Sequence, residues 1–120
     1  FHRSLQQGDW VVLDHADTIA DGLAARSVYQ LPYVIMRDHV KDVVLLSEEE
    51  ILQGISLALA TTHNLAEGAG AASLMAAFKR RQQLQGKKVV LVMTGGNLDR
   101  VSLEQALSYS PPSASSNDSE

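Results

Sequence analysis

The sequence Val89-Val90-Leu91-Val92-Met93-Thr94-Gly95-Gly96-Asn97 carries the clearest strand signal in the chain and a glycine-rich turn directly after it. A continuous apolar run of this length is typical of a strand that is buried on both faces, as in a parallel sheet. Ligands of open α/β sheets bind beyond the carboxyl ends of the strands. This stretch therefore predicts both the class of the fold and the place where a ligand would lie.

Working outward, further strand and helix signals alternate along the chain. Trp10–Leu13 is a short strand candidate, and Val43–Leu46 is a second apolar run of the buried type. Ser47 and Glu50 form a capping-box pattern that opens a strong helix. Helices are predicted over Phe1–Gln7, Pro32–Val40, Ser47–His63, Ala66–Leu84 and Asp99–Leu107. Buried-type strands alternating with helices indicate an α/β fold with parallel strands flanked by helices.

Composition narrows the classes of protein that fit. The chain has 120 residues, 45% of them hydrophobic, which suits one domain with a modest core. Ten Lys and Arg residues against 14 Asp and Glu residues give a net charge of -4, so nucleic acid is not an expected partner. The sequence has no cysteine and no apolar run long enough to cross a membrane. Residues 1–107 are predicted to form the domain and residues 108–120 a disordered polar tail.

The turn after the last strand offers several groups to a ligand. The hydroxyl of Thr94 can donate or accept a hydrogen bond, Gly95 and Gly96 permit a close approach of the backbone, and Asn97 can fix the turn. A tight turn between a strand and a helix would have the same composition. From spacing alone, both interpretations stay open.

Other candidate residues have structural explanations of similar weight. Glu67 begins a helix rich in Ala and Gly, where a carboxylate also suits the positive end of the helix dipole. Asp17 and Asp21 could bind a cation, but two carboxylates are weak evidence for a metal site. The histidines show no paired spacing. Lys41, Lys79, Lys87 and Lys88 all have the surroundings of solvated side chains, unlike a lysine held against a cofactor.

Taken together and in order, four segments resemble one enzyme family. Thr18–Ala24 is similar to its TIADGLAV loop, Val43–Ile51 to its VVLVSEEEI strand and helix start, Glu67–Ala72 to EPSGAA, and Val90–Asn97 to VVILSGGN. The family is the threonine dehydratase and serine racemase group of fold-type II pyridoxal-phosphate enzymes. The resemblance implies an α/β fold, part of the large domain of a tryptophan synthase beta-like enzyme, over about Phe1 to Leu107.

The resemblance also implies roles for individual residues. Thr94 matches the hydroxyl residue that hydrogen-bonds the pyridine nitrogen of pyridoxal 5'-phosphate, with threonine in place of serine. Glu67 matches the acid near the cofactor ring, and Gly95, Gly96 and Asn97 complete the cofactor-binding turn. Gly22, with Ala20 and Asp21, matches the loop that lines the substrate pocket. Gly68 and Ala69 replace the Pro and Ser of EPSG, so the shape of this wall departs from the family's pattern.

Several parts of the family pattern are not in the sequence. The motif with the Schiff-base lysine, the loop that cradles the phosphate and the segment with cation ligands would lie upstream, so the expectation is a C-terminal fragment that is inactive in isolation. The expected parent enzyme is a cytoplasmic threonine or serine ammonia-lyase, a dimer or tetramer, that deaminates L-threonine to 2-oxobutanoate. A serine racemase, a hydroxyaspartate ammonia-lyase and a truncated, non-catalytic interaction module are the alternatives.

Overall fold

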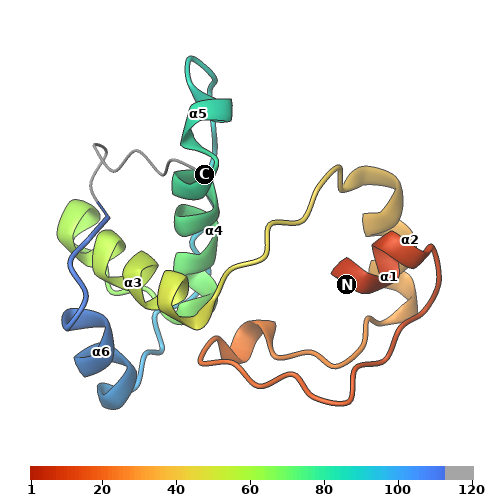
Figure 1. Ribbon diagram of the computed structural model, residues 1–120, viewed down its shortest axis with the longest axis horizontal. Coiled ribbons are helices and arrows are strands. Elements are labelled where there is room, and N and C mark those ends of the chain that lie inside the picture. The colour runs from red at the N-terminus through yellow and green to blue at the C-terminus, as the bar shows by residue number, and fades with distance from the viewer. Residues whose placement is uncertain (113–120) are drawn as a thin grey trace.

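The computed structural model describes residues 1–112 as two groups of helices joined by irregular segments (Figure 1). One group contains α1 and α2, and the other contains α3, α4 and α6 with the short α5 at the end of α4 (Figure 1). The elements are α1 (His2–Gln7), a 3-10 turn η1 (Asp21–Leu23), α2 (Gln30–His39), α3 (Glu48–Thr62), α4 (Gly68–Lys79), α5 (Arg81–Leu84) and α6 (Arg100–Leu107). Most of the predicted polar tail, residues 113–120, lies outside the described residues.

The predicted capping box begins α3 and is confirmed by both of its hydrogen bonds. The Glu50 backbone N–H donates to Ser47 Oγ at 3.1 Å, and the Ser47 backbone N–H donates to Glu50 Oε2 at 2.7 Å. The helix ends at His63, which adopts a left-handed conformation with φ of 57°. Local sequence therefore determines both ends of this helix.

The core lies where α3 packs against α4, and small residues bring the two helices close together. Ile55 of α3 is 1% exposed, and Ala71 of α4 is fully buried. A Cβ added at Gly54 would lie 3.0 Å from Met75 Cβ and 3.2 Å from the Ala71 carbonyl oxygen. The glycine is therefore needed for the close contact between the helices, and the Ala-rich first half of α4 serves the same packing.

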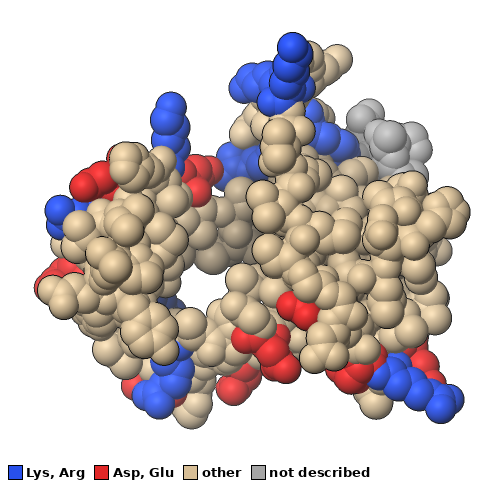
Figure 2. Space-filling model, turned by 180° about the vertical axis from the view of Figure 1, so that it is seen from behind, with Lys and Arg blue, Asp and Glu red and all other residues tan. Residues whose placement is uncertain are grey.

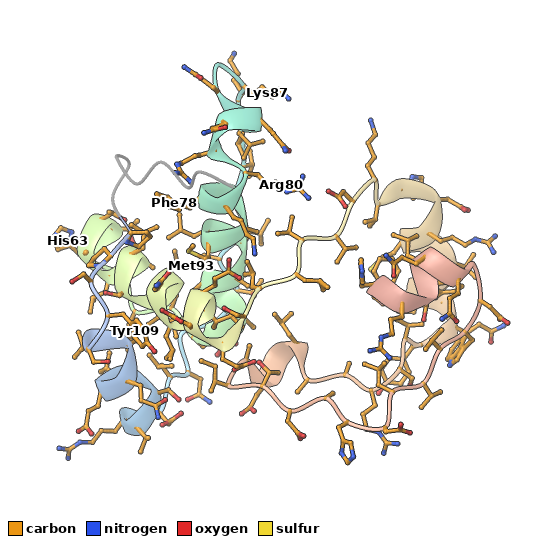
Figure 3. The ribbon with its side chains drawn as sticks, in the orientation of Figure 1. His63, Phe78, Arg80, Lys87, Met93 and Tyr109 are labelled. Atoms are coloured by element: carbon orange, nitrogen blue, oxygen red, sulfur yellow. The ribbon has the colours of Figure 1, made fainter. Side chains whose placement is uncertain are left out.

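The last helix, α6, also packs against α3. Asp99 caps it, because the Asp99 carboxylate accepts the Ser102 N–H at 2.9 Å. Beyond α6, Tyr109 is half-buried against the core, and its carbonyl oxygen accepts a hydrogen bond of 2.9 Å from Ser56 Oγ (Figure 3). Tyr109 falls inside the predicted polar tail but packs against the hydrophobic core of the domain.

Helices α1 and α2 pack together through Tyr33. The Tyr33 hydroxyl donates to the Ser4 carbonyl oxygen at 3.2 Å, and the rings of Phe1 and Trp10 lie edge-on to the Tyr33 ring, each 6.3 Å from it. Gly8 ends α1 with φ of 68°, as the sequence predicts.

Two predicted boundaries in helical regions differ from the structure. Helix α2 begins two residues before Pro32, which lies in the first turn, where its missing N–H has no cost. The helix predicted over 66–84 is divided at Arg80, whose φ and ψ of -100° and 14° leave the α-helical region. The Arg80 guanidinium binds the Asp42 carboxylate at 3.0 Å at this break. No helix among the described residues is long and apolar enough to cross a membrane.

The predicted strands are not formed within residues 1–112. Trp10–Leu13, Val43–Leu46 and Val89–Met93 have no strand assignment. A parallel strand exists only by pairing with a neighbour, and the latter two segments instead accept hydrogen bonds from side chains of α4. Ser73 Oγ donates to the Val92 carbonyl oxygen at 2.8 Å, and Lys79 Nζ to the Leu45 carbonyl oxygen at 3.2 Å.

Glu50 links the capping box to α4 and makes folding sensitive to acid. Partial burial raises the pKa of the Glu50 carboxyl, but the hydrogen bonds from Lys79 and Ser47 and the Lys79 charge together lower that pKa below its ordinary value. A lowered pKa in the folded state stabilises the fold above the pKa of the unfolded chain. That stabilisation disappears as the pH falls through the folded-state pKa.

We therefore expect Glu50→Gln to destabilise the chain by about 0.5–1 kcal/mol at pH 7, since both partners are partly solvated. The difference from wild type should shrink toward zero below about pH 4. Urea unfolding between pH 3 and 7 measures it, with Glu49→Gln as the control because Glu49 contacts the neutral Gln53 amide. If the difference in stability between Glu50→Gln and wild type is the same at every pH, the lowered pKa of Glu50 does not contribute to stability.

Candidate functional site

The structure brings all of the predicted site residues together at one end of α4. The turn Thr94–Asn97 lies against the start of α4, and the loop Ala20–Gly22 contacts the same end of the helix. Residues from three distant parts of the sequence are thus in contact at this end of the helix. The site is built around the first turn of α4 rather than around a strand end.

Glu67 joins the turn to the helix through two hydrogen bonds. Its backbone N–H donates to the Gly95 carbonyl oxygen at 3.3 Å, and its Oε2 accepts the Asn97 backbone N–H at 3.1 Å. Glu67 is the N-cap residue of α4, but its side chain makes no capping hydrogen bond within that helix. The favourable position of Glu67 at the start of the helix dipole therefore does not fully explain this residue. Its carboxylate binds the turn that follows Met93.

The glycines of the site permit contacts within the chain. Gly95 has φ of 77°, and a Cβ there would lie 2.6 Å from Glu67 Cδ and Oε1. A Cβ at Gly96 would lie 2.7 Å from the Leu65 carbonyl oxygen, and one at Gly70 would lie 2.6 Å from the Thr94 carbonyl oxygen. The turn can pack on α4 only because these three positions have no side chain. The sequence had suggested that the glycines permit the backbone to approach a ligand closely.

The loop around Gly22 packs on the same first turn of α4. A Cβ at Gly22 would lie 2.9 Å from Ala69 Cβ and 3.7 Å from Glu67 Oε1, and one at Gly68 would lie 3.1 Å from Ala20 Cα. Ala20 is buried, whereas Asp21 and Gly22 are exposed. Gly68 and Ala69, which depart from the family's pattern, are thus the residues that receive this loop.

Thr94 presents a free hydroxyl at the edge of the site. The residue is exposed, and its hydroxyl has no hydrogen-bond partner among residues 1–112. Asn97 contributes its backbone N–H to Glu67, and its backbone is not left-handed. A neutral hydroxyl that can both donate and accept fits a pyridine nitrogen in either protonation state. The donor set therefore suits the ring edge of pyridoxal phosphate.

A separate cavity of about 660 Å³ lies between the two groups of helices, and the sequence did not predict it. Val43, Val44, Ile51 and Ala72 are among its apolar lining residues, and Thr94 and Glu67 are not. The space-filling view shows an opening through the molecule at this place (Figure 2). The apolar run Val43–Leu46, which the sequence predicts to be a buried strand, lines this cavity.

The lysines and carboxylates show no second reactive centre in the described part of the chain. Lys41, Lys79, Lys87 and Lys88 are exposed, and Lys79 pairs with Glu50 at 2.6 Å. Among residues 1–112, no group of three or more His, Asp or Glu side chains is arranged to hold a metal ion. Asp17 and Asp21, weighed as cation ligands from the sequence, belong to no such group.

Comparisons with known proteins identify the family to which the chain belongs. The family model described as "Pyridoxal-phosphate dependent enzyme" matches residues 1–95. An L-threonine ammonia-lyase from Geobacter sulfurreducens is 43% identical over 82% of this chain, which spans 24% of that protein. The processed form of threonine deaminase isoform 2 from Solanum lycopersicum superposes with a TM-score of 0.80 at 25% identity, covering 89% of this chain and 32% of that one.

A serine racemase from maize is also similar, with a TM-score of 0.77 and 28% identity over 89% of this chain and 35% of that one. The chain spans about a quarter to a third of the length of these three relatives. The family model nevertheless covers most of it, including the loop, the first turn of α4 and Thr94 with Gly95. The chain therefore belongs to the pyridoxal-phosphate-dependent enzymes, and within them to the fold-type II group of threonine dehydratases and serine racemases.

Proposed function

We propose that this chain is the C-terminal part of a threonine ammonia-lyase that converts L-threonine to 2-oxobutanoate and ammonia with pyridoxal 5'-phosphate. The observation that carries the proposal is the convergence of Thr94, Glu67 and the Gly22 loop on one end of α4. The name of the relative from Geobacter sulfurreducens supports threonine as the substrate.

The residues of this chain would bind and orient the cofactor ring. The Thr94 hydroxyl would hydrogen-bond the pyridine nitrogen, and Gly95, Gly96 and Asn97 would hold that hydroxyl in place through the turn. Bound pyridoxal phosphate supplies the electron sink for the loss of the β-hydroxyl. A neutral hydroxyl partner would not force the ring nitrogen to stay protonated, and this would favour loss of the β-hydroxyl over other reactions of the substrate.

The Ala20–Gly22 loop would form one side of the substrate pocket. Asp21 and Gly22 are exposed beside the first turn of α4, so both can face a small amino acid. The substrate class follows from the relatives, whose names describe enzymes of amino acids. The lysine that holds the cofactor would lie outside this sequence, since all four lysines here are exposed.

We further propose that Val43–Leu46 and Val89–Met93 are parallel strands in the complete enzyme. Val90 is 89% exposed and Val92 is 66% exposed, which is unusual for a run of consecutive β-branched and apolar residues. Neighbouring strands would cover these side chains and pair the free backbone groups. We expect the complete enzyme to be a cytoplasmic homo-oligomer, a dimer or tetramer.

A product assay of the complete enzyme that carries this sequence tests the substrate. L-Threonine with pyridoxal phosphate should yield 2-oxobutanoate and ammonia in equal amounts. L-Serine, L-threo-3-hydroxyaspartate and L-serine racemisation are measured in parallel. A higher kcat/KM for serine racemisation or for hydroxyaspartate would show that the enzyme is a serine racemase or a hydroxyaspartate ammonia-lyase. The absence of turnover with all of these substrates would favour a non-catalytic module.

A further inference from the structure

We propose that Glu67 is a positioning residue, whose carboxylate acts as a hydrogen-bond acceptor that fixes the Thr94–Asn97 turn, and that its negative charge is not required. This inference rests on the proposed function for the role of Thr94. It goes beyond what the family resemblance implies for Glu67, which is only that it matches the acid near the cofactor ring.

The contacts of Glu67 enclose the turn from two sides. The Glu67 backbone N–H donates to the Gly95 carbonyl oxygen at 3.3 Å, and Glu67 Oε2 accepts a hydrogen bond of 3.1 Å from the Asn97 backbone N–H. The carboxylate also occupies the space beside Gly95 that a side chain would fill, with Cδ 2.6 Å from the ideal Cβ position. One residue therefore fixes the peptide groups on both sides of Gly96, in the turn that begins at Thr94.

The same carboxylate also reaches the substrate loop. Glu67 Oε1 lies 3.7 Å from the ideal Cβ position of Gly22, while Oε2 binds Asn97. Oε1 lies closer to the ideal Cβ position of Gly95, at 2.6 Å, so the carboxylate packs mainly on the turn and approaches the loop only at Gly22.

In the described part of the chain, the Glu67 carboxylate serves as an acceptor and contacts no charged side chain. Among residues 1–112, the ion pairs are formed by other acids, and the group bonded to the Glu67 carboxylate is a neutral backbone N–H. A glutamine side chain has the same length and keeps one carbonyl oxygen for that N–H. An aspartate keeps the charge but is shorter by one methylene group. Length and charge can therefore be separated by substitution.

The first test is amide hydrogen exchange at Asn97, which needs no cofactor. We expect Glu67→Ala and Glu67→Asp to speed the exchange of the Asn97 amide by on the order of tenfold, and Glu67→Gln to change it by less than about twofold. The measurement is made on this chain and repeated on the complete enzyme. Glu104→Ala is the control, because Glu104 pairs with Arg100 on the surface of α6, outside the site.

The second test is the affinity of the complete enzyme for pyridoxal phosphate and the absorption spectrum of the bound cofactor. Glu67→Gln should retain both, and Glu67→Asp should weaken binding and alter the spectrum. If Gln behaves like Ala or Asp, the charge is required and the proposal is wrong. Unchanged Asn97 exchange in Glu67→Asp would also overturn it, even if Glu67→Ala fails to fold.

The two hypotheses fail in different ways. If the wild-type enzyme binds no pyridoxal phosphate, the proposed function is wrong, whereas the exchange of the Asn97 amide still reports on the contact made by Glu67. If the wild-type enzyme binds the cofactor, but Glu67→Asp changes neither the exchange of the Asn97 amide nor the cofactor affinity, the proposed function stands and the positioning role is wrong.

Discussion

Gly95→Ala is expected to lower the free energy of unfolding by about 1.5–2.5 kcal/mol. Gly95 has φ of 77°, a conformation that costs a residue with a Cβ about 1 kcal/mol. The new methyl group would also lie 2.6 Å from Glu67 Cδ, and Glu67 cannot move without losing its hydrogen bond to Asn97. The flexible end of Glu67 would shift away from the methyl group, and the lost hydrogen bond to Asn97 costs about 0.5–1.5 kcal/mol in addition.

Gly86→Ala is the matched control for that substitution. Gly86 has a similar φ of 75°, but no atom lies within 4 Å of its ideal Cβ position. Its replacement should cost only the conformational part, about 1 kcal/mol. Urea unfolding of the two variants therefore separates backbone strain from the contact with Glu67. Equal losses of stability would show that the carboxylate does not occupy the space beside Gly95.

Thr94→Ala is expected to weaken the binding of pyridoxal phosphate by the complete enzyme by about 1–3 kcal/mol, or roughly 5- to 150-fold. The reason is that the ring nitrogen would be left without a hydrogen-bond partner in a largely buried position. Thr94→Ser keeps the hydroxyl and should bind the cofactor nearly as well as wild type.

The Thr94 substitution should have little effect on the stability of the cofactor-free protein. Thr94 is exposed, and its hydroxyl has no partner among the described residues, so Thr94→Ala should change the free energy of unfolding by less than about 0.5 kcal/mol. A residue that served only the turn would show the opposite result, with a loss of stability and no specific loss of affinity.

The helices were predicted from the sequence because their signals are local. Ser47 with Glu50, the glycine after Gln7 and Asp99 before α6 each act within one turn of their helix. The division of the helix after Lys79 could not be predicted in this way, because it coincides with the contact between Arg80 and Asp42, which are far apart in the sequence.

The strands depend on partners, and this explains why the sequence and the structure differ there. The run Val89–Met93 has the composition of a buried strand, yet it lies along α4 with its side chains exposed in the described chain. An apolar run reports that a segment needs to be covered, but not which segment covers it. The parallel sheet therefore remains a proposal for the complete enzyme.

The residues of the candidate site could be predicted from the sequence, but their geometry could not. Thr94, Glu67 and Gly22 were identified by their resemblance to a family, and the structure places them at one end of α4. That Gly95 faces Glu67 follows from an approach of segments about 30 residues apart, which no local pattern encodes. Whether these residues bind the cofactor stays a prediction.

The measurement that tests this prediction most directly is the dissociation constant for pyridoxal phosphate of the complete enzyme with threonine, serine or alanine at position 94. Wild type and Thr94→Ser should agree within about twofold, and Thr94→Ala should bind roughly 5- to 150-fold more weakly with unchanged stability of the cofactor-free protein. If Thr94→Ala binds the cofactor as tightly as Thr94→Ser, Thr94 does not hold the ring nitrogen, and the assignment of the site is wrong.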